Sequence, residues 1–162
     1  MAIVLQVVGF KNSGKTTLIR DFIGMLKQQS YTVHAIKHDA HDFEMDHIGT
    51  DTYFFAEEGA DAVMITSSEK YAIVSQENVT LHDAIAKLGA ADITLVEGYK
   101  NAPFPKIVLL RSADEMMWFK QEVGQIIAFV SLVRLEQNEV TFIGTNETRT
   151  AFLESLIGEF LE

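Results

Sequence analysis

The sequence predicts an α/β domain in which a mostly parallel β-sheet is flanked by helices. Apolar residues make up 48% of the chain, a level typical of strands that are covered on both faces. Segments with strand and helix patterns alternate throughout, which indicates parallel strands joined by right-handed crossovers. The 162 residues contain no repeat or flexible linker, so we expect one domain over residues 1–162.

The expected strands are short apolar runs, and the expected helices carry apolar residues along one face. Strands are predicted at 3–8, 31–36, 62–66, 71–75, 93–96, 107–110, 126–130 and 140–143. Helices are predicted at 15–29, 50–59, 80–88 and 113–122, and a C-terminal helix begins at Thr145 or Asn146. Thr50 is a candidate N-cap of the second helix because its hydroxyl can accept a bond from the first turn.

Composition argues against several classes of function. The chain has 13 basic and 23 acidic residues, and only four of them are arginines; this disfavours a nucleic-acid binder, which clusters Lys and Arg against phosphates. The absence of cysteine excludes disulfides, thiol catalysis and cysteine-ligated metals. No apolar run approaches the roughly 20 residues of a membrane span. The N-terminal residues lack a basic leader, so a cytoplasmic protein is expected.

The strongest functional signal is a phosphate loop between the first strand and the first helix. Residues 9–16 read GFKNSGKT and match G-x-x-x-x-G-K-[ST] at every defined position. The two glycines let backbone N–H groups turn inward onto phosphate oxygens, and the helix adds its positive N-terminal end. Lys15 is predicted to lie between the β- and γ-phosphates, and the Thr16 hydroxyl to bind Mg²⁺. The expected nucleotide contacts are Gly9, Lys11, Asn12, Ser13, Gly14, Lys15, Thr16 and Thr17. Lys11 could instead be a solvated loop residue.

A polar segment rich in Asp and His follows the second expected strand. Parallel strands bring such segments to one edge of the sheet, so this one could reach the phosphate loop. Asp46, or a neighbouring aspartate, could hold Mg²⁺ through its water shell. His38 and His41 could orient an attacking group or contact an anion. These side chains could equally form a solvated loop.

Glu97 is the second candidate carboxylate, at the end of the apolar run 93–96. A carboxylate beside a buried strand is costly unless a cation compensates its charge. Next to a phosphate loop, that cation would be Mg²⁺ or Lys15, which makes Glu97 a candidate metal-binding and catalytic residue beside Lys15 and Asp46. Alternatively, Glu97 is a solvent-facing residue at a strand end.

Together these segments resemble the molybdopterin-guanine dinucleotide biosynthesis protein B (MobB) family. The resemblance extends to about Arg111 and is carried by residues 9–17, Lys37-His38-x-x-His41, Asp46-x-x-Gly49-x-Asp51-Thr52, Glu97-Gly98-Tyr99-Lys100 and Pro105-Lys106-Ile107. Thr50 stands where the family usually carries Lys, which weakens any phosphate role at that position.

The resemblance implies a P-loop protein that binds GTP with Mg²⁺ and is at most a weak GTP hydrolase. It also implies an accessory role beside the nucleotidyltransferase that joins a guanine nucleotide to molybdopterin. The preference for guanine follows from the resemblance alone, because no N-K-x-D or T-K-x-D segment follows a strand. The resemblance further implies a homodimer, and two clusters of large apolar residues, at 53–55 and 116–119, favour association as well.

Two other functions stay open from the sequence. A small-molecule kinase would surround the transferred phosphoryl group with several arginines, whereas Arg111, Arg134 and Arg149 are widely scattered along this chain. A non-hydrolysing adaptor would use the nucleotide as a ligand or switch, and the sequence is neutral on this alternative.

Overall fold

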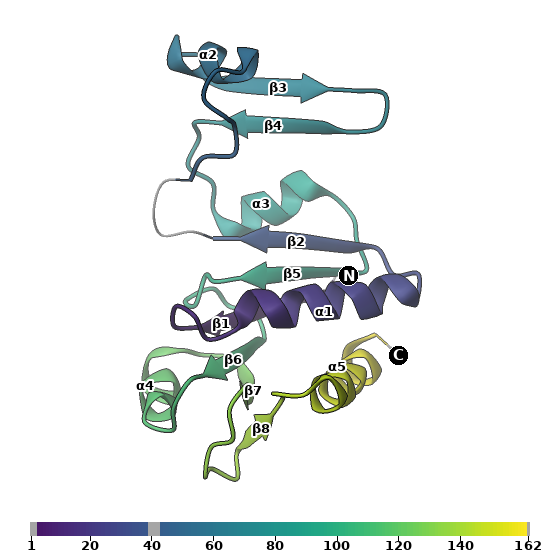
Figure 1. The fold of residues 1–162 in the computed structure, drawn as a ribbon, viewed down its shortest axis with the longest axis vertical. Helices are drawn as coiled ribbons and strands as arrows, with labels where there is room; N and C mark the ends of the chain where they lie inside the picture. Colours follow the sequence, from purple (N-terminus) through teal and green to yellow (C-terminus); the bar gives the residue numbers. More distant parts are fainter. Residues whose placement is uncertain (1–2, 39–42, 162) are drawn as a thin grey trace. The chain divides into compact units, whose positions relative to one another are not determined.

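The computed structural model describes residues 3–38 and 43–161, which form two compact units (Figure 1). The first unit comprises Met1–His38 and Leu81–Glu162, and the second comprises Asp39–Thr80. The elements of the first unit are β1 (Ile3–Gly9), α1 (Lys15–Gln28), β2 (Val33–Lys37), α3 (Leu81–Leu88), β5 (Ile93–Glu97), β6 (Lys106–Leu110), α4 (Glu115–Glu122), β7 (Ile126–Ser131), β8 (Val140–Phe142) and α5 (Asn146–Phe160). Those of the second are α2 (Asp51–Glu57), β3 (Ala62–Thr66) and β4 (Tyr71–Ser75).

The six strands of the first unit form one parallel sheet in the order β2-β5-β1-β6-β7-β8. The predicted α/β fold class is therefore confirmed. The central strands β1, β5 and β6 are rich in Val, Ile and Leu, and most of these residues are buried, on both faces of the sheet. Such runs suit a central parallel strand, because helices cover both of its faces.

Helices cover the two faces of this sheet with separate apolar clusters. The larger cluster joins α1 and α5 to β1, β5 and β6 around Leu5, Leu95 and Leu109. The smaller one packs α4 onto the opposite side chains of the sheet, such as Val108, while α3 packs against β2. The Thr145 hydroxyl caps α5, which begins at one of the two predicted positions. Among the described helices, none combines the length and apolar character needed to cross a lipid bilayer.

The second unit is a two-stranded antiparallel hairpin accompanied by one short helix. β3 and β4 pair antiparallel, which differs from the parallel arrangement predicted for most strands. The reason is the connection: residues 67–70 are too few for the crossover that parallel strands need. Thr50 caps α2 by accepting a hydrogen bond from the Tyr53 N–H, which confirms its predicted role.

Candidate functional site

The loop between β1 and α1 is a tight turn that requires both of its glycines. Gly14 has a φ of +101°, and a Cβ at this position would lie 2.3 Å from Cδ1 of Leu132. A Cβ on Gly9 would lie 2.6 Å from the Leu109 carbonyl oxygen. Larger residues would therefore force the loop open. Because α1 begins at Lys15, directly after Gly14, its unpaired N–H groups and positive dipole end face the loop.

The Lys15 ammonium lies back over the first turn of this loop. Its Nζ donates hydrogen bonds to the carbonyl oxygens of Gly9 at 3.0 Å and Phe10 at 2.8 Å. Burial lowers the pKa of Lys15, and the positive charges of Lys37 and Arg111 add to this effect, while Glu97 opposes it. The ammonium is held by neutral acceptors, so incoming phosphate oxygens can replace them with stronger, charge-assisted bonds.

Glu97 and Thr16 meet at the edge of the sheet beside the loop. The Thr16 hydroxyl donates to Oε2 of Glu97 at 2.9 Å, although 81 residues separate them in the chain. Glu97 ends β5, where the pairing register sets it opposite Val7 of β1 and Lys37 of β2. The structure therefore brings together the two residues that the sequence predicts as metal ligands.

This pair of oxygen groups fits the chemistry of Mg²⁺. The ion prefers oxygen ligands and usually takes only one or two from the protein, with phosphates and water completing its shell. The described residues hold no cluster of three or more His, Asp or Glu side chains suited to a metal. A site that depends on a bound nucleotide for its remaining ligands would have this composition.

The remaining side chains of the loop differ in exposure. Lys11, Asn12 and Thr17 are exposed, so a ligand can reach them, and Asn12 adopts a φ of +62°. Ser13 is buried, and its hydroxyl has no hydrogen-bond partner within the described part of the chain. Direct contacts of these four side chains with a nucleotide stay a prediction.

His38 lies beside Glu97 and faces the segment that follows β5. Its N–H donates to the Glu97 carbonyl oxygen at 2.9 Å, and its ring stacks on Tyr99 with the centroids 4.3 Å apart. Gly98 allows this approach: its φ is +94°, and a Cβ there would lie 3.3 Å from His38 Cβ. His38 thus lies at the strand end next to Glu97, with its ring on Tyr99.

Two buried polar residues that sequence reasoning did not assign to the site hold the loop after β5. Gln6 Nε2 donates to the carbonyl oxygens of Gly98 at 2.9 Å and Tyr99 at 2.7 Å. Lys106 is buried at the start of β6, and its ammonium donates to two carbonyl oxygens of the same loop, those of Ala102 and Phe104. The sequence does contain a sign of both residues: Gln6 is a polar residue inside an apolar strand, and Lys106 is one at the start of such a strand.

Arg111 is a third residue that the sequence did not place at the site. It directly follows β6, and its Nη1 donates to the carbonyl oxygen of Lys11 in the phosphate loop at 3.3 Å. The two residues are 100 positions apart in the chain, and Arg111 belongs to none of the motifs that predicted the site. The other two arginines outside α1 have different neighbours: Arg149 pairs with Asp21, and Arg134 lies over the ring of Phe142.

His41 and Asp46 are the other two site residues predicted in the Asp/His segment. His41 lies outside the described residues. Asp46 belongs to the second unit, where its carboxylate accepts hydrogen bonds from the Thr50 hydroxyl and the His47 N–H, both at 2.8 Å. Hydrogen bonds from the hydroxyls of Thr52 and Thr50 are the main reason why the pKa of Asp46 is lowered. These contacts order the start of α2, and a catalytic role for Asp46 stays a prediction.

Comparisons of sequence identify a family. The family model described as MobB, Molybdopterin guanine dinucleotide synthesis protein B, matches residues 4–132. The chain is 35% identical over 133 residues to the molybdopterin-guanine dinucleotide biosynthesis adapter protein of Haemophilus influenzae, covering 79% of this chain and 73% of that protein. It is 28% identical over 142 residues to a probable adapter protein of the same description from Bacillus subtilis, covering 85% and 79%.

Comparisons of structure agree with this result. The crystal structure of a MobB protein homolog from Bacillus stearothermophilus matches with a TM-score of 0.74 and 25% identity, covering 97% of both chains. The crystal structure of Bacillus subtilis MobB matches with a TM-score of 0.78 and 23% identity, covering 98% of both chains. The P-loop fold thus extends over nearly the whole chain.

The position of Lys15 generates a prediction for Lys15→Ala. This change should weaken nucleotide binding at least about 10–100-fold, because a charged hydrogen bond contributes about 1.5–3 kcal/mol and about 1.4 kcal/mol corresponds to tenfold. Binding is measured by calorimetry, and folding by circular dichroism. Lys27→Ala is the matched control: it removes the same charge from the other end of α1, where Lys27 bonds the Tyr31 carbonyl. Near-normal affinity in folded Lys15→Ala protein would overturn the phosphate-loop assignment.

Proposed function

This chain belongs to the MobB family, and we propose that it is a GTP-binding accessory protein of molybdenum cofactor synthesis with slow, Mg²⁺-dependent GTPase activity. The observation that carries the proposal is the phosphate loop with Lys15 poised over it and the Thr16–Glu97 pair beside it. The descriptions of the relatives support the rest. Their names refer to the biosynthesis of molybdopterin-guanine dinucleotide and describe the proteins as adapters.

Different residues of this chain would bind different parts of the Mg²⁺-nucleotide. Loop N–H groups and the start of α1 would bind the phosphate oxygens, and Lys15 would exchange its two carbonyl partners for the β- and γ-phosphates. Thr16 and Glu97 would hold Mg²⁺, which neutralises phosphate charge when bound. His38, which lies next to Glu97, would contact an anion or orient an attacking group.

The partner follows from the adapter role. We infer that the chain acts beside the nucleotidyltransferase that joins a guanine nucleotide to molybdopterin, and that this takes place in the cytoplasm. An accessory protein of this kind needs the nucleotide as a bound ligand more than it needs rapid turnover. The test is to measure the affinity for GTP and ATP with and without Mg²⁺, and then hydrolysis with and without small acceptors. Turnover that requires an acceptor would favour a kinase instead.

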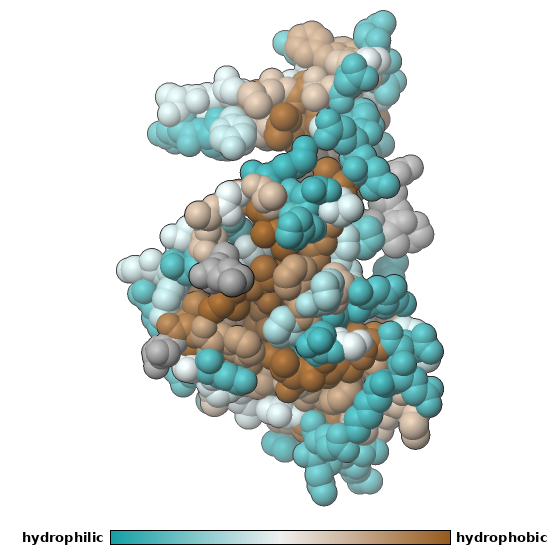
Figure 2. All heavy atoms as spheres, turned by 180° about the vertical axis from the view of Figure 1, so that it is seen from behind, coloured by the Kyte–Doolittle hydropathy of each residue, from teal (hydrophilic) through white to brown (hydrophobic). Residues whose placement is uncertain are grey.

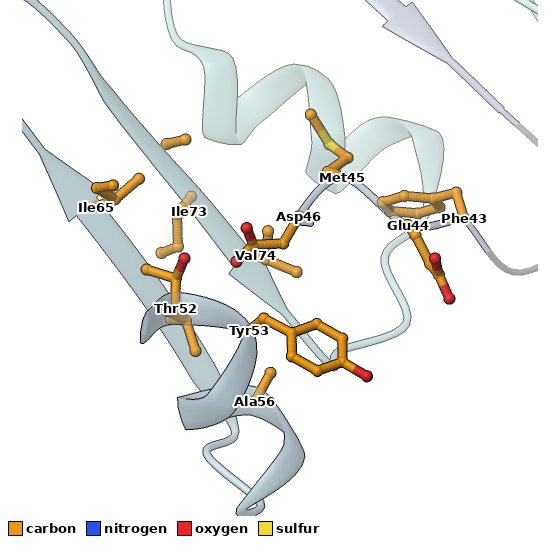
Figure 3. Close-up of a pocket in the computed structure, with 12 residues that line it drawn as sticks. Phe43, Glu44, Met45, Asp46, Thr52, Tyr53, Ala56, Ile65, Ile73 and Val74 are labelled. Carbon is orange, nitrogen blue, oxygen red and sulfur yellow. The ribbon is translucent and has the colours of Figure 1, made fainter. Parts of the chain in front are cut away.

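The second unit supports the proposal that the protein works as a homodimer. None of its described residues is buried, yet it carries many large apolar side chains at its surface (Figure 2). On one face of the hairpin, apolar side chains of β3, β4 and α2 surround a pocket of about 250 Å³ (Figure 3). An isolated two-stranded hairpin is marginally stable at best. This unit therefore needs further apolar cover.

The other face of the hairpin offers the surface for a second copy. Met64 of β3 and Tyr71 of β4 do not line this pocket, and both are more than half exposed. Neither strand contains a charged residue or a proline, the features that normally protect free strand edges from pairing. The apolar cluster on α4 is less available, because Phe119 is buried and Trp118 packs against the core.

Glu97→Gln tests the metal part of this proposal. The change should weaken binding of Mg²⁺-GTP about 10–100-fold and leave binding of metal-free GTP in EDTA nearly unchanged, because only the metal-bound form uses the carboxylate. Glu122→Gln, at the exposed end of α4, is the control for loss of one negative charge. Equal losses with and without Mg²⁺ would assign Glu97 a structural role.

Met64→Lys tests the homodimer. The unaltered chain should have about twice the monomer mass of 18.1 kDa in light scattering at micromolar concentration. Met64→Lys should shift the mass to that of the monomer, because a charge would be buried in the apolar contact. Met117→Lys, on an exposed position of α4, should leave the mass of the dimer unchanged. Monomer mass for the unaltered chain, with and without nucleotide, would contradict the proposal.

A further inference from the structure

Arg111 lies at the first turn of the phosphate loop. It is the first residue after β6, and β6 pairs with β1, the strand that leads into the loop. Its Nη1 donates to the Lys11 carbonyl oxygen at 3.3 Å, and its guanidinium carbon lies 5.3 Å from the centroid of the Phe10 ring. The side chain is 49% exposed, so it contacts the loop and still has a face open to a ligand.

Glu115 of α4 fixes the orientation of this guanidinium. Its side chain is only 7% exposed. Oε1 accepts a hydrogen bond from Arg111 Nε at 2.7 Å and lies 2.6 Å from Nη2, while Oε2 accepts from the Arg111 backbone N–H at 2.9 Å. The carboxylate therefore holds one side of the fork and leaves Nη1 directed at the loop. A guanidinium held in this way loses little conformational freedom when it binds an anion.

The contacts of Lys15 show which end of a nucleotide this turn faces. The lysine of this motif reaches the β- and γ-phosphates, and here its ammonium lies on the carbonyls of Gly9 and Phe10. Lys11 continues the same turn, so Arg111 borders the position of the terminal phosphate. The two cations also influence each other, since the charge of Arg111 helps to lower the pKa of Lys15.

We propose that Arg111 is a further phosphate-binding residue, whose guanidinium, oriented by Glu115, contacts the terminal phosphate of a bound nucleoside triphosphate. The proposal rests on the nucleotide binding proposed above. An arginine supplied by the same chain neutralises charge on the terminal phosphoryl group, where the change from tri- to diphosphate takes place. The residue thereby lets the protein distinguish a triphosphate from a diphosphate, which an accessory protein can use as a signal to its partner.

The test compares two nucleotides on the full chain. Dissociation constants for a non-hydrolysable GTP analogue and for GDP, both with Mg²⁺, are measured by calorimetry for the unaltered protein, Arg111→Ala, Arg111→Lys and Glu115→Gln. Arg111→Ala should weaken the triphosphate analogue about 10–100-fold and GDP less than about threefold, because only the triphosphate offers the terminal group. Arg111→Lys keeps the charge but loses the planar guanidinium, so its affinity for the triphosphate analogue should lie between those of the unaltered protein and Arg111→Ala. The same intermediate affinity is expected for Glu115→Gln.

The controls separate this role from others. Arg20→Ala removes one positive charge from an exposed position of α1 and should change neither constant. Equal losses for both nucleotides in Arg111→Ala and Arg111→Lys would mean that Arg111 only braces the loop, and would overturn the proposal, as would unchanged constants. If Arg111→Ala does not fold, the test uses Arg111→Lys, and compares its loss of affinity for the triphosphate analogue with its loss of affinity for GDP. Failure of the unaltered chain to bind either nucleotide would overturn the proposed function itself.

Discussion

The parallel pairing of β1 with β5 and β6 is the constraint on which the site depends. Backbone hydrogen bonds set Val7 opposite Glu97 and Gly9 opposite Leu109. The phosphate loop therefore begins at the same edge of the sheet where β5 presents its carboxylate and β6 is followed by Arg111. A slip of one residue between β1 and β5 would turn every side chain to the other face, and Glu97 would no longer reach Thr16.

Apolar alternation cannot specify this register, because the central strands are apolar on both faces. The buried side chain of Gln6 favours this register over others. Its amide is buried in β1 and donates to the carbonyl oxygens of Gly98 and Tyr99. In another register that amide would be buried without partners, at a cost of about 1–3 kcal/mol. Lys106 at the start of β6 donates locally to the carbonyl oxygens of Ala102 and Phe104, so two buried polar side chains hold the loop that lies beside Glu97.

The features that the sequence revealed are those encoded locally. The phosphate loop is contiguous, and its spacing follows from the turn itself, while strands and helices follow from their periodicity. Glu97 could be inferred because parallel strand ends converge at one edge. The same rule places Arg111, which follows β6, at this edge, but its contact with Lys11 also involves the hydrogen bonds from Arg111 to Glu115 of α4, which no local pattern indicates. The strands at 62–66 and 71–75 were predicted, but their antiparallel pairing was not, because residues 67–70 lack the Asn-Gly or Asp-Gly turn that marks a hairpin.

The negative charge of the chain is distributed unequally between the two units. The chain carries −10 overall, but residues 39–80 hold ten acidic residues and one lysine. The unit with the phosphate loop has thirteen acidic and twelve basic residues and is therefore almost neutral. Most of the excess negative charge that argued against nucleic acid thus belongs to the second unit. Lys15 and Arg111 of the first unit can attract an anionic nucleotide, and charge-free β3 and β4 remain available for apolar association.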